Sequence, residues 1–231
     1  IGAEGFEAAL RAKIRRPRGE ILQEDYDRVG SISAIDINGA NIKDIRFIQP
    51  LRNLTKVDFA NQPISDLSPL STCTLIKQVV LGELRKVTSI KPFESMVNLE
   101  HLYIHGDMSA LRKPELTLSK LDSLKTLEVQ SLELNYSDFI SNLNALNKLM
   151  VPPTADFPAI AKQKNIKSLI VFILPGTIDR MPKLEVFSNF SHLSKLMFSF
   201  YNVKKTLTEG DINQLKNMLP SVQVTVGGGL F

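Results

Sequence analysis

A three-residue apolar pattern recurs along this chain at near-constant spacing. When the first apolar residue of a copy is numbered 1, apolar residues also stand at positions 4 and 6. The copies are Ile32/Ile35/Ile37, Leu54/Val57/Phe59, Ile76/Val79/Leu81, Leu99/Leu102/Ile104, Leu124/Leu127/Val129, Leu146/Leu149/Val151, Ile166/Leu169/Val171 and Leu193/Leu196/Phe198. Successive copies start 22, 22, 23, 25, 22, 20 and 27 residues apart. This period indicates a solenoid, because one such unit is too small to bury its own apolar face.

The spacing within a copy predicts a short strand. Positions 4 and 6 face the same side of a strand, toward the core, whereas positions 3, 5 and 7 face the opposite side. Stacked copies then share one continuous core, and their strands form a parallel sheet that lines a concave surface. Side chains at the odd positions of that surface are not needed for packing. In this frame the first copy places Asp36 at position 5 and Asn38 at position 7.

Apolar residues beyond the first three strands predict a buried return leg on the convex side. They are Ile42 and Ile45 in the first copy, Ile64, Leu67 and Leu70 in the second, and Ile90 and Phe93 in the third. Aspartate and proline among them favour tight turns or short 3₁₀ segments. Later copies are interrupted on this side by Pro114, Pro152, Pro153, Pro158, Pro175 and Pro182.

Amphipathic segments at both ends predict caps for the solenoid. Residues 4–16 carry Phe6, Leu10 and Ile14 at four-residue spacing, which predicts a helix, and a second short helix is expected at 24–29. The expected organisation is a helical N-terminal cap at 1–31, about eight repeats at 32–206, and a C-terminal helix–strand cap with a glycine-rich tail at 207–231. The fold class is therefore α/β, a capped repeat solenoid.

The C-terminal cap has its own local signals. Thr208 has the side chain of an N-cap residue, and the buried face of the following helix is expected at Ile212, Leu215 and Leu219. Alternating valines then predict a terminal strand at residues 222–226.

The second repeat carries a specific family resemblance. The segment Ile64-Ser-Asp-Leu-Ser-Pro-Leu70, after Leu54-Thr-Lys-Val-Asp-Phe59, resembles the 22-residue repeat of the internalin-like class of bacterial leucine-rich repeat proteins. Residues 6–21 resemble the helical cap that precedes such repeats, and the resemblance extends to about residue 200. It implies a leucine-rich repeat solenoid that recognises proteins without catalysis, often at a bacterial surface or secreted. A cytoplasmic location stays open.

One feature of that class is missing. The family often has asparagine at position 9, where its side chain bonds the turn backbone. Here position 9 holds Ala40, Gln62, Leu84, Asp107, Leu132, Thr154, Leu174 and Tyr201. The sequence therefore lacks the asparagine ladder of the family.

Composition narrows the function classes. The hydrophobic content of 43% and charged content of 23% are those of a folded globular chain, and no apolar run approaches the roughly 20 residues that cross a bilayer. Lys and Arg number 28 against 24 Asp and Glu, a net charge of +4 that permits an acidic partner without requiring one. The single Cys73 excludes an internal disulfide and is expected to be a small buried residue.

No catalytic constellation is found in the sequence. It contains no G-x-S-x-G, P-loop or G-x-G-x-x-G motif, so we expect no enzyme, cofactor or small-molecule substrate. His101 and His105 lie roughly 13 Å apart along an extended strand, too far to ligate one metal ion. They flank Tyr103 and are interpreted as binding-surface residues around an aromatic side chain.

The later repeats place large apolar residues on the surface expected to be open. They are Met150, Ile170, Phe172, Met197 and Phe200. An exposed apolar patch of this kind typically marks an interaction site. Lysines surround it as a rim, formed by Lys56, Lys148 and Lys195 at position 3 and by Lys77, Lys125 and Lys167 at position 2. The alternative interpretation is that the C-terminal cap or a loop covers this patch and makes it core.

The sequence thus predicts a protein-binding module that docks its partner on the concave face. The expected contacts are Tyr103, Met150, Ile170, Phe172, Met197, Phe200, His101, His105, Lys148 and Lys195. Two alternatives stay open. One is a structural spacer within a larger surface protein. The other is an anion or nucleic-acid binder through the basic run Arg11, Lys13, Arg15, Arg16 and Arg18, which is otherwise the solvated face of the capping helix.

Overall fold

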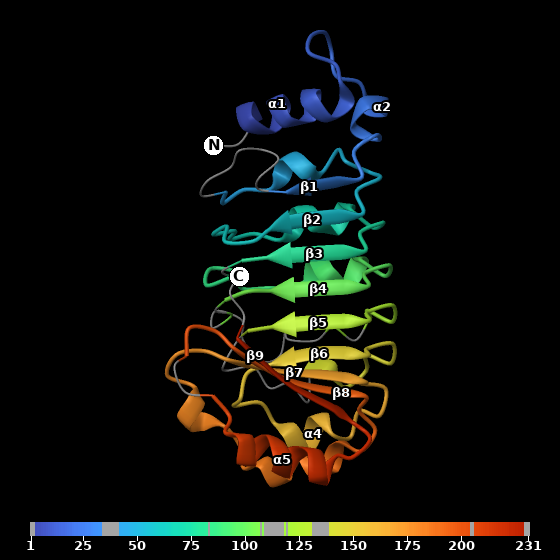
Figure 1. Ribbon diagram of the computed structural model, residues 1–231. Coiled ribbons are helices and arrows are strands. Elements are labelled where there is room, and N and C mark those ends of the chain that lie inside the picture. Colours follow the sequence, from blue (N-terminus) through green and yellow to red (C-terminus); the bar gives the residue numbers. More distant parts are fainter. Residues whose placement is uncertain are drawn as a thin grey trace.

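The computed structural model describes residues 3–33, 42–82, 84–106, 108, 118, 120–130, 139–203 and 206–228. In these ranges nine strands form one parallel sheet whose order follows the sequence (Figure 1). The strands are β1 (Ser31–Ser33), β2 (Lys56–Phe59), β3 (Gln78–Leu81), β4 (His101–Ile104), β5 (Thr126–Val129), β6 (Lys148–Val151), β7 (Ser168–Ile173), β8 (Lys195–Phe200) and β9 (Gln223–Gly228).

The register of the sheet aligns equivalent repeat positions side by side. Val57 pairs with Val79, and Leu102 pairs with Leu127, so that position 4 of each repeat lies beside position 4 of the next. Residues at positions 4 and 6 of the second to eighth repeats are almost completely buried in a single core cluster. The predicted α/β solenoid with a parallel sheet is confirmed.

The first repeat has a different frame from the predicted one. Ile32 pairs with Val57, so Ile32 occupies position 4 rather than position 1, and the buried Val29 takes position 1. Both frames fit the local pattern, but only this one stacks Ile32 on the core residue of β2. Ser33 therefore holds position 5. Asp36 and Asn38, which the wrong frame assigned to the concave face, lie outside the described residues.

Short 3₁₀ helices form the convex side of the early repeats, as predicted. They are η1 (Arg46–Ile48), η2 (Ser68–Thr72) and η3 (Lys91–Ser95). An aspartate precedes each of the first two 3₁₀ helices and bonds to its first residue. Asp44 Oδ1 accepts the N–H of Arg46 at 2.9 Å, and Asp66 Oδ1 accepts the N–H of Ser68 at 2.8 Å. Each 3₁₀ helix buries one large apolar side chain in the core, and Phe93 is the largest of them.

The later convex side is built around phenylalanines. Its elements are α4 (Phe157–Ile160), η5 (Ile178–Arg180) and η6 (Leu184–Phe190). The ring centroid of Phe187 lies 5.0 Å from that of Phe157 and 5.4 Å from that of Phe198 on β8. Pro158, expected to interrupt this side, lies in the first turn of α4, where a helix tolerates proline.

Helices close both ends of the solenoid (Figure 1). At one end, α1 (Ala3–Ile14) buries Phe6, Leu10 and Ile14, and α2 (Gln23–Tyr26) follows it. At the other end, α5 (Glu209–Met218) packs against η6, with Leu215 and Leu219 buried and Ile212 only partly buried. Thr208 caps α5, since its Oγ1 accepts the N–H of Asp211 at 3.1 Å. The predicted terminal strand is β9, which extends the sheet in parallel.

Polar side chains also connect neighbouring repeats. Asparagine stands directly before position 1 in three repeats and donates Nδ2 to a carbonyl oxygen of the preceding turn. The pairs are Asn53 with Asp27 at 2.9 Å, Asn98 with Thr74 at 3.0 Å, and Asn165 with Leu143 at 2.9 Å. Gln62, at the position 9 where the family has asparagine, accepts the N–H of Ile42 through Oε1 at 2.9 Å. Each bond satisfies a backbone group that the stacking leaves unpaired.

At Gly82 the backbones of two adjacent repeats lie too close together to leave room for a side chain. An alanine Cβ there would lie 2.4 Å from the backbone nitrogen of Asn61, in the turn after β2. Gly82→Ala is therefore expected to lower the free energy of unfolding by about 1–3 kcal/mol, measured by denaturant titration. Gly30→Ala is the matched control, because its Cβ would have no neighbour closer than Thr55 Oγ1 at 3.9 Å. Equal losses in both variants would contradict a local clash.

His192 stands directly before position 1 of its repeat, where Asn165 stands in the previous one. Both ring nitrogens are enclosed, and in the described structure neither makes a hydrogen bond of standard geometry. Burial, and then the charges of Lys164 and Lys167, lower the pKa of the His192 imidazole, while the nearby backbone of Gln163 opposes this. Because the unfolded chain then binds a proton more readily, stability contributed by the neutral ring is lost as the pH falls below about 6.5.

We expect His192→Asn to reduce this acid sensitivity, because asparagine carries no titrating proton and supplies the donor that this position uses elsewhere. The measurement is the melting temperature at pH 7 and pH 5. The drop between the two should be smaller in the variant than in the original chain. The prediction fails if both lose the same number of degrees.

Candidate functional site

The concave face consists of the odd positions of nine parallel strands. The register aligns them in rows that cross the sheet. The row of position 3 runs Ser31, Lys56, Gln78, His101, Thr126, Lys148, Ser168, Lys195 and Gln223. The row of position 5 runs Ser33, Asp58, Val80, Tyr103, Glu128, Met150, Ile170, Met197 and Thr225.

The centre of this face carries the histidine–tyrosine group expected from the sequence. His101 and Tyr103 project from β4, and their rings stack at a centroid distance of 6.4 Å and an angle of 23°. His105 directly follows the strand, and its Nδ1 lies 3.1 Å from Nε2 of Gln130. All three side chains are half-buried, so each keeps a surface that a partner can contact.

An ion pair separates this group from the apolar residues of the later repeats. Lys148 Nζ donates to Glu128 Oε1 at 2.6 Å, and Glu128 is only 8% exposed. Glu128 lies beside Tyr103 in the row of position 5. Burial raises the pKa of the Tyr103 phenol, the negative charge of Glu128 raises it further, and Lys148 opposes this. The centre of the concave face therefore carries polar and charged groups that are partly shielded from water.

Most lysines of the predicted rim already have partners within the chain. Lys125 Nζ lies 2.6 Å and Lys77 Nζ 3.6 Å from the carboxylate of Glu100. These lysines, with Lys125 contributing most, lower the pKa of the Glu100 carboxyl. Lys167 donates to the backbone carbonyl of Lys164 at 3.2 Å. In the described structure Lys56 and Lys195 are the rim lysines without an ion-pair or hydrogen-bond partner, so they are the ones available to an acidic group.

The apolar residues of the later repeats divide into two sets. Met150 and Met197 are half-buried on the concave face, as expected for a contact surface. Ile170 and Phe172 also belong to the concave side but are each only 8% exposed, and Phe172 packs against Tyr201 with ring centroids 6.3 Å apart. The expectation that these two side chains are open is wrong, because both are buried.

Phe200 was assigned to the wrong face. The strand β8 is two residues longer than β2 to β6, so the alternation of sides continues to its end. Phe200 therefore faces the core with Leu196 and Phe198, and it is 3% exposed. The predicted alternation covered positions 3 to 7, and Phe200 stands one residue beyond it, at position 8. The partner-binding roles of all ten residues stay a prediction.

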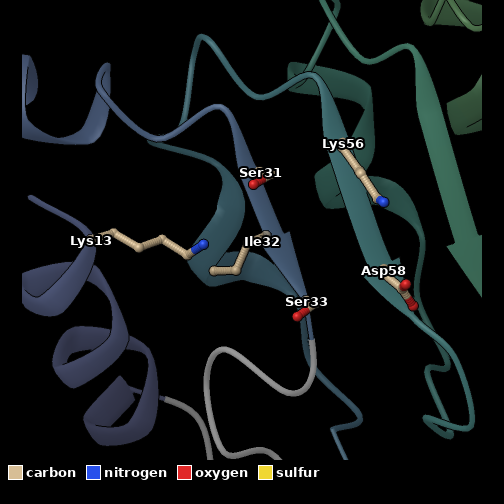
Figure 2. Close-up of a pocket in the computed structure, with 6 residues that line it drawn as sticks. All are labelled: Lys13, Ser31, Ile32, Ser33, Lys56 and Asp58. Atoms are coloured by element: carbon tan, nitrogen blue, oxygen red, sulfur yellow. The ribbon is translucent and has the colours of Figure 1, made fainter.

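A polar hollow lies at the N-terminal end of the concave face (Figure 2). Lys13 reaches from α1 toward Ser31 and Ser33 on β1, and Lys56 and Asp58 stand on the neighbouring strand β2. The hollow has a volume of about 250 Å³. No local pattern in the sequence indicates this hollow, because Lys13 and Lys56 come from different elements that only the fold brings together.

Two residues of the basic run, Arg11 and Arg16, bond within the cap. Arg11 Nε lies 2.8 Å from Glu7 Oε1, and its Nη2 donates to the carbonyl of Gly19 at 3.0 Å. Arg16 pairs with the buried Asp25 at 2.5 Å. A hydrogen bond from the Leu22 N–H, together with Arg16, lowers the pKa of the Asp25 carboxyl. Arg11 and Arg16 thus stabilise the turn between α1 and α2.

Among the described residues, no group of three or more His, Cys, Asp or Glu residues is arranged to hold a metal ion. No helix described here is both long and apolar enough to cross a bilayer. Cys73 is buried as expected, and burial raises the pKa of its thiol.

No protein-family model matches the chain, and no curated protein matches it. Among solved structures, an internalin of Listeria monocytogenes, InlF, aligns with a TM-score of 0.62 at 16% identity, covering 99% of this chain and 71% of that one. Internalin C2 of the same bacterium aligns with a TM-score of 0.60 at 17% identity, covering 96% of this chain and 92% of that one. The chain has an internalin-like leucine-rich repeat fold. At this identity the likeness concerns the fold alone.

Within this internalin-like fold, sequence reasoning found the central group and missed its electrostatic neighbour. The pairing of Glu128 with Lys148 joins positions 5 and 3 of adjacent strands, so their separation of 20 residues carries no local signal. The asparagines before position 1 did have a local sequence signal, since three repeats have Asn directly before their first apolar residue.

The phenol of Tyr103 offers a direct test of the central electrostatics. In Glu128→Gln the repulsion of the phenolate is removed while Lys148 remains, so the pKa of Tyr103 is expected to fall. An ultraviolet absorbance titration measures it, and the chain with Tyr103→Phe identifies the Tyr103 contribution among the four tyrosines. An unchanged or raised pKa would show that Glu128 does not act on Tyr103.

Proposed function

We propose that this chain is a non-catalytic protein-interaction module and that its partner docks on the concave face. The observation that carries the proposal is a row of half-buried side chains, Val80, Tyr103, Met150 and Met197, which cross the sheet outside the core cluster. The fold does not need them for packing, yet each presents apolar surface. Aromatic and methionine side chains are typical of the centre of protein interfaces.

The internalin-like fold supports this proposal, because its concave sheet is a wide and rigid surface. We assign the partner contacts to His101, Tyr103, His105, Met150 and Met197, with Lys148 and Lys195 at the edge. Ile170, Phe172 and Phe200 act below the surface in this proposal, as packing that holds the contact residues. Lys195, which has no partner in the described structure, would pair with an acidic group and orient the partner.

The proposed function predicts that charges placed on the row of position 5 abolish binding. The immobilised chain is compared with a Tyr103→Asp, Met150→Asp variant in capture from bacterial and host lysates, and the affinity for each captured protein is then measured. We expect at least a tenfold weaker affinity for the variant, because central aromatic residues dominate interface energies.

The matched control is Leu75→Asp, Val97→Asp, which adds the same two charges away from the concave face. Val97 is the most exposed of the large apolar residues in the described structure, at 54%, and Leu75 is also exposed. Both variants must keep the original melting temperature. Equal capture by all three chains would contradict docking on the concave face. Capture that disappears at moderate salt would favour the anion-binding alternative, and no capture would favour a spacer.

A further inference from the structure

The last strand of the sheet leaves an open edge. β9 pairs with β8 on one side, and in the described ranges no segment pairs with its other side. The strand is six residues long and contains neither a charged residue nor a proline. Proteins usually protect such an edge with charge, proline, a bulge or a covering element. α5 packs against η6 and also contacts β9, but among the described residues β8 is the one strand that pairs with β9, so α5 does not fill this edge.

Two valines present the unpaired backbone groups of this edge. The N–H of Gln223 donates to the carbonyl of Ser194 at 2.9 Å, so Gln223 directs its backbone toward β8. Alternate residues of a strand direct their N–H and C=O groups to opposite sides. Thr225 therefore also bonds toward β8, whereas Val224 and Val226 direct their N–H and C=O groups outward.

The side chains of β9 also lack part of their packing. Val224 and Val226 face the core but are only partly buried, whereas Leu196 and Phe198, their partners on β8, are fully buried. On the other face of the strand, Thr225 Oγ1 is enclosed and has no hydrogen-bond partner among the described residues. Within the described part of the chain, β9 thus has fewer backbone and side-chain neighbours than the internal strands.

We propose that a second copy of this chain pairs with β9 in antiparallel fashion and joins the two sheets. The segment Val224-Thr225-Val226 reads the same in both directions, so a two-fold axis at Thr225 places valine opposite valine. Val224 then exchanges both backbone hydrogen bonds with Val226 of the partner subunit, and the reverse pair does the same. The uncharged strands do not repel one another.

The axis also gives the unpaired hydroxyl a partner. Thr225 faces Thr225 of the partner subunit at a non-hydrogen-bonded position, where opposed side chains lie closest in an antiparallel pair. A turn about χ1 brings the two hydroxyls together, and threonine pairs of this kind stabilise sheets. This self-complementarity is the reason for choosing a second copy over an unrelated strand. The inference is independent of the proposed function, which concerns the concave face.

Sedimentation velocity of the 231-residue chain tests the pairing. We expect a concentration-dependent dimer of about twice 25.8 kDa. Val226→Pro removes an outward N–H that β8 does not use, and Thr225→Lys places like charges across the axis; both variants are expected to be monomers. Val97→Lys, which adds a charge at an exposed site elsewhere, is expected to dimerise like the original chain. Circular dichroism and melting temperature establish that each variant is folded.

Hydrogen exchange locates the contact. The amides of Val224 and Val226 should gain protection as the protein concentration rises, while that of Gln223, already bonded to β8, should not change. A chain that stays monomeric up to its solubility limit overturns the proposal and leaves the edge to a strand from another protein. A dimer that survives in both edge variants, with no change in exchange at β9, also overturns it.

Discussion

The stacking of apolar residues from one repeat onto the next is the interaction on which this structure depends. No single repeat encloses a core, so Val57, Val79 and Leu102 are buried only because neighbouring strands keep a common register. The register in turn brings backbone groups of adjacent turns together, where Gln62 and Asn165 satisfy them. Apolar stacking and polar bridging therefore support one another along the whole sheet.

Because each repeat is buried only by its neighbours, the two ends of the solenoid differ from its middle. At the N-terminal end α1 lays Phe6 and Leu10 on the core, and the buried Asp25 anchors Arg16 in the turn between α1 and α2. At the C-terminal end α5 covers η6 and contacts β9, which continues the sheet and has no strand beside its outer edge in the described residues. Helices thus cover both ends of the solenoid, and within the described ranges the last strand keeps an unpaired backbone edge.

The concave face is made of side chains that the core does not need for packing. In the middle of the sheet, Tyr103 lies between two histidines and beside the ion pair of Glu128 with Lys148. Toward the C-terminal end Ile170 and Phe172 are buried, whereas Met150 and Met197 keep part of their surface exposed. From the N-terminal to the C-terminal end, the concave face therefore has a polar hollow, then an aromatic centre, and then a more tightly packed region.

The sequence by itself determined the repeat period, the alternation of sides, the 3₁₀ turns begun by Asp44 and Asp66, and the helix capped by Thr208. These features depend on local spacing and local hydrogen bonds, which are written in consecutive residues. Only the tertiary structure decided that Ile32 occupies position 4, that Phe200 faces the core, and that Ile170 and Phe172 are closed off. Register, strand length and exposure depend on what the neighbouring repeat supplies, and no repeat carries that information within its own residues.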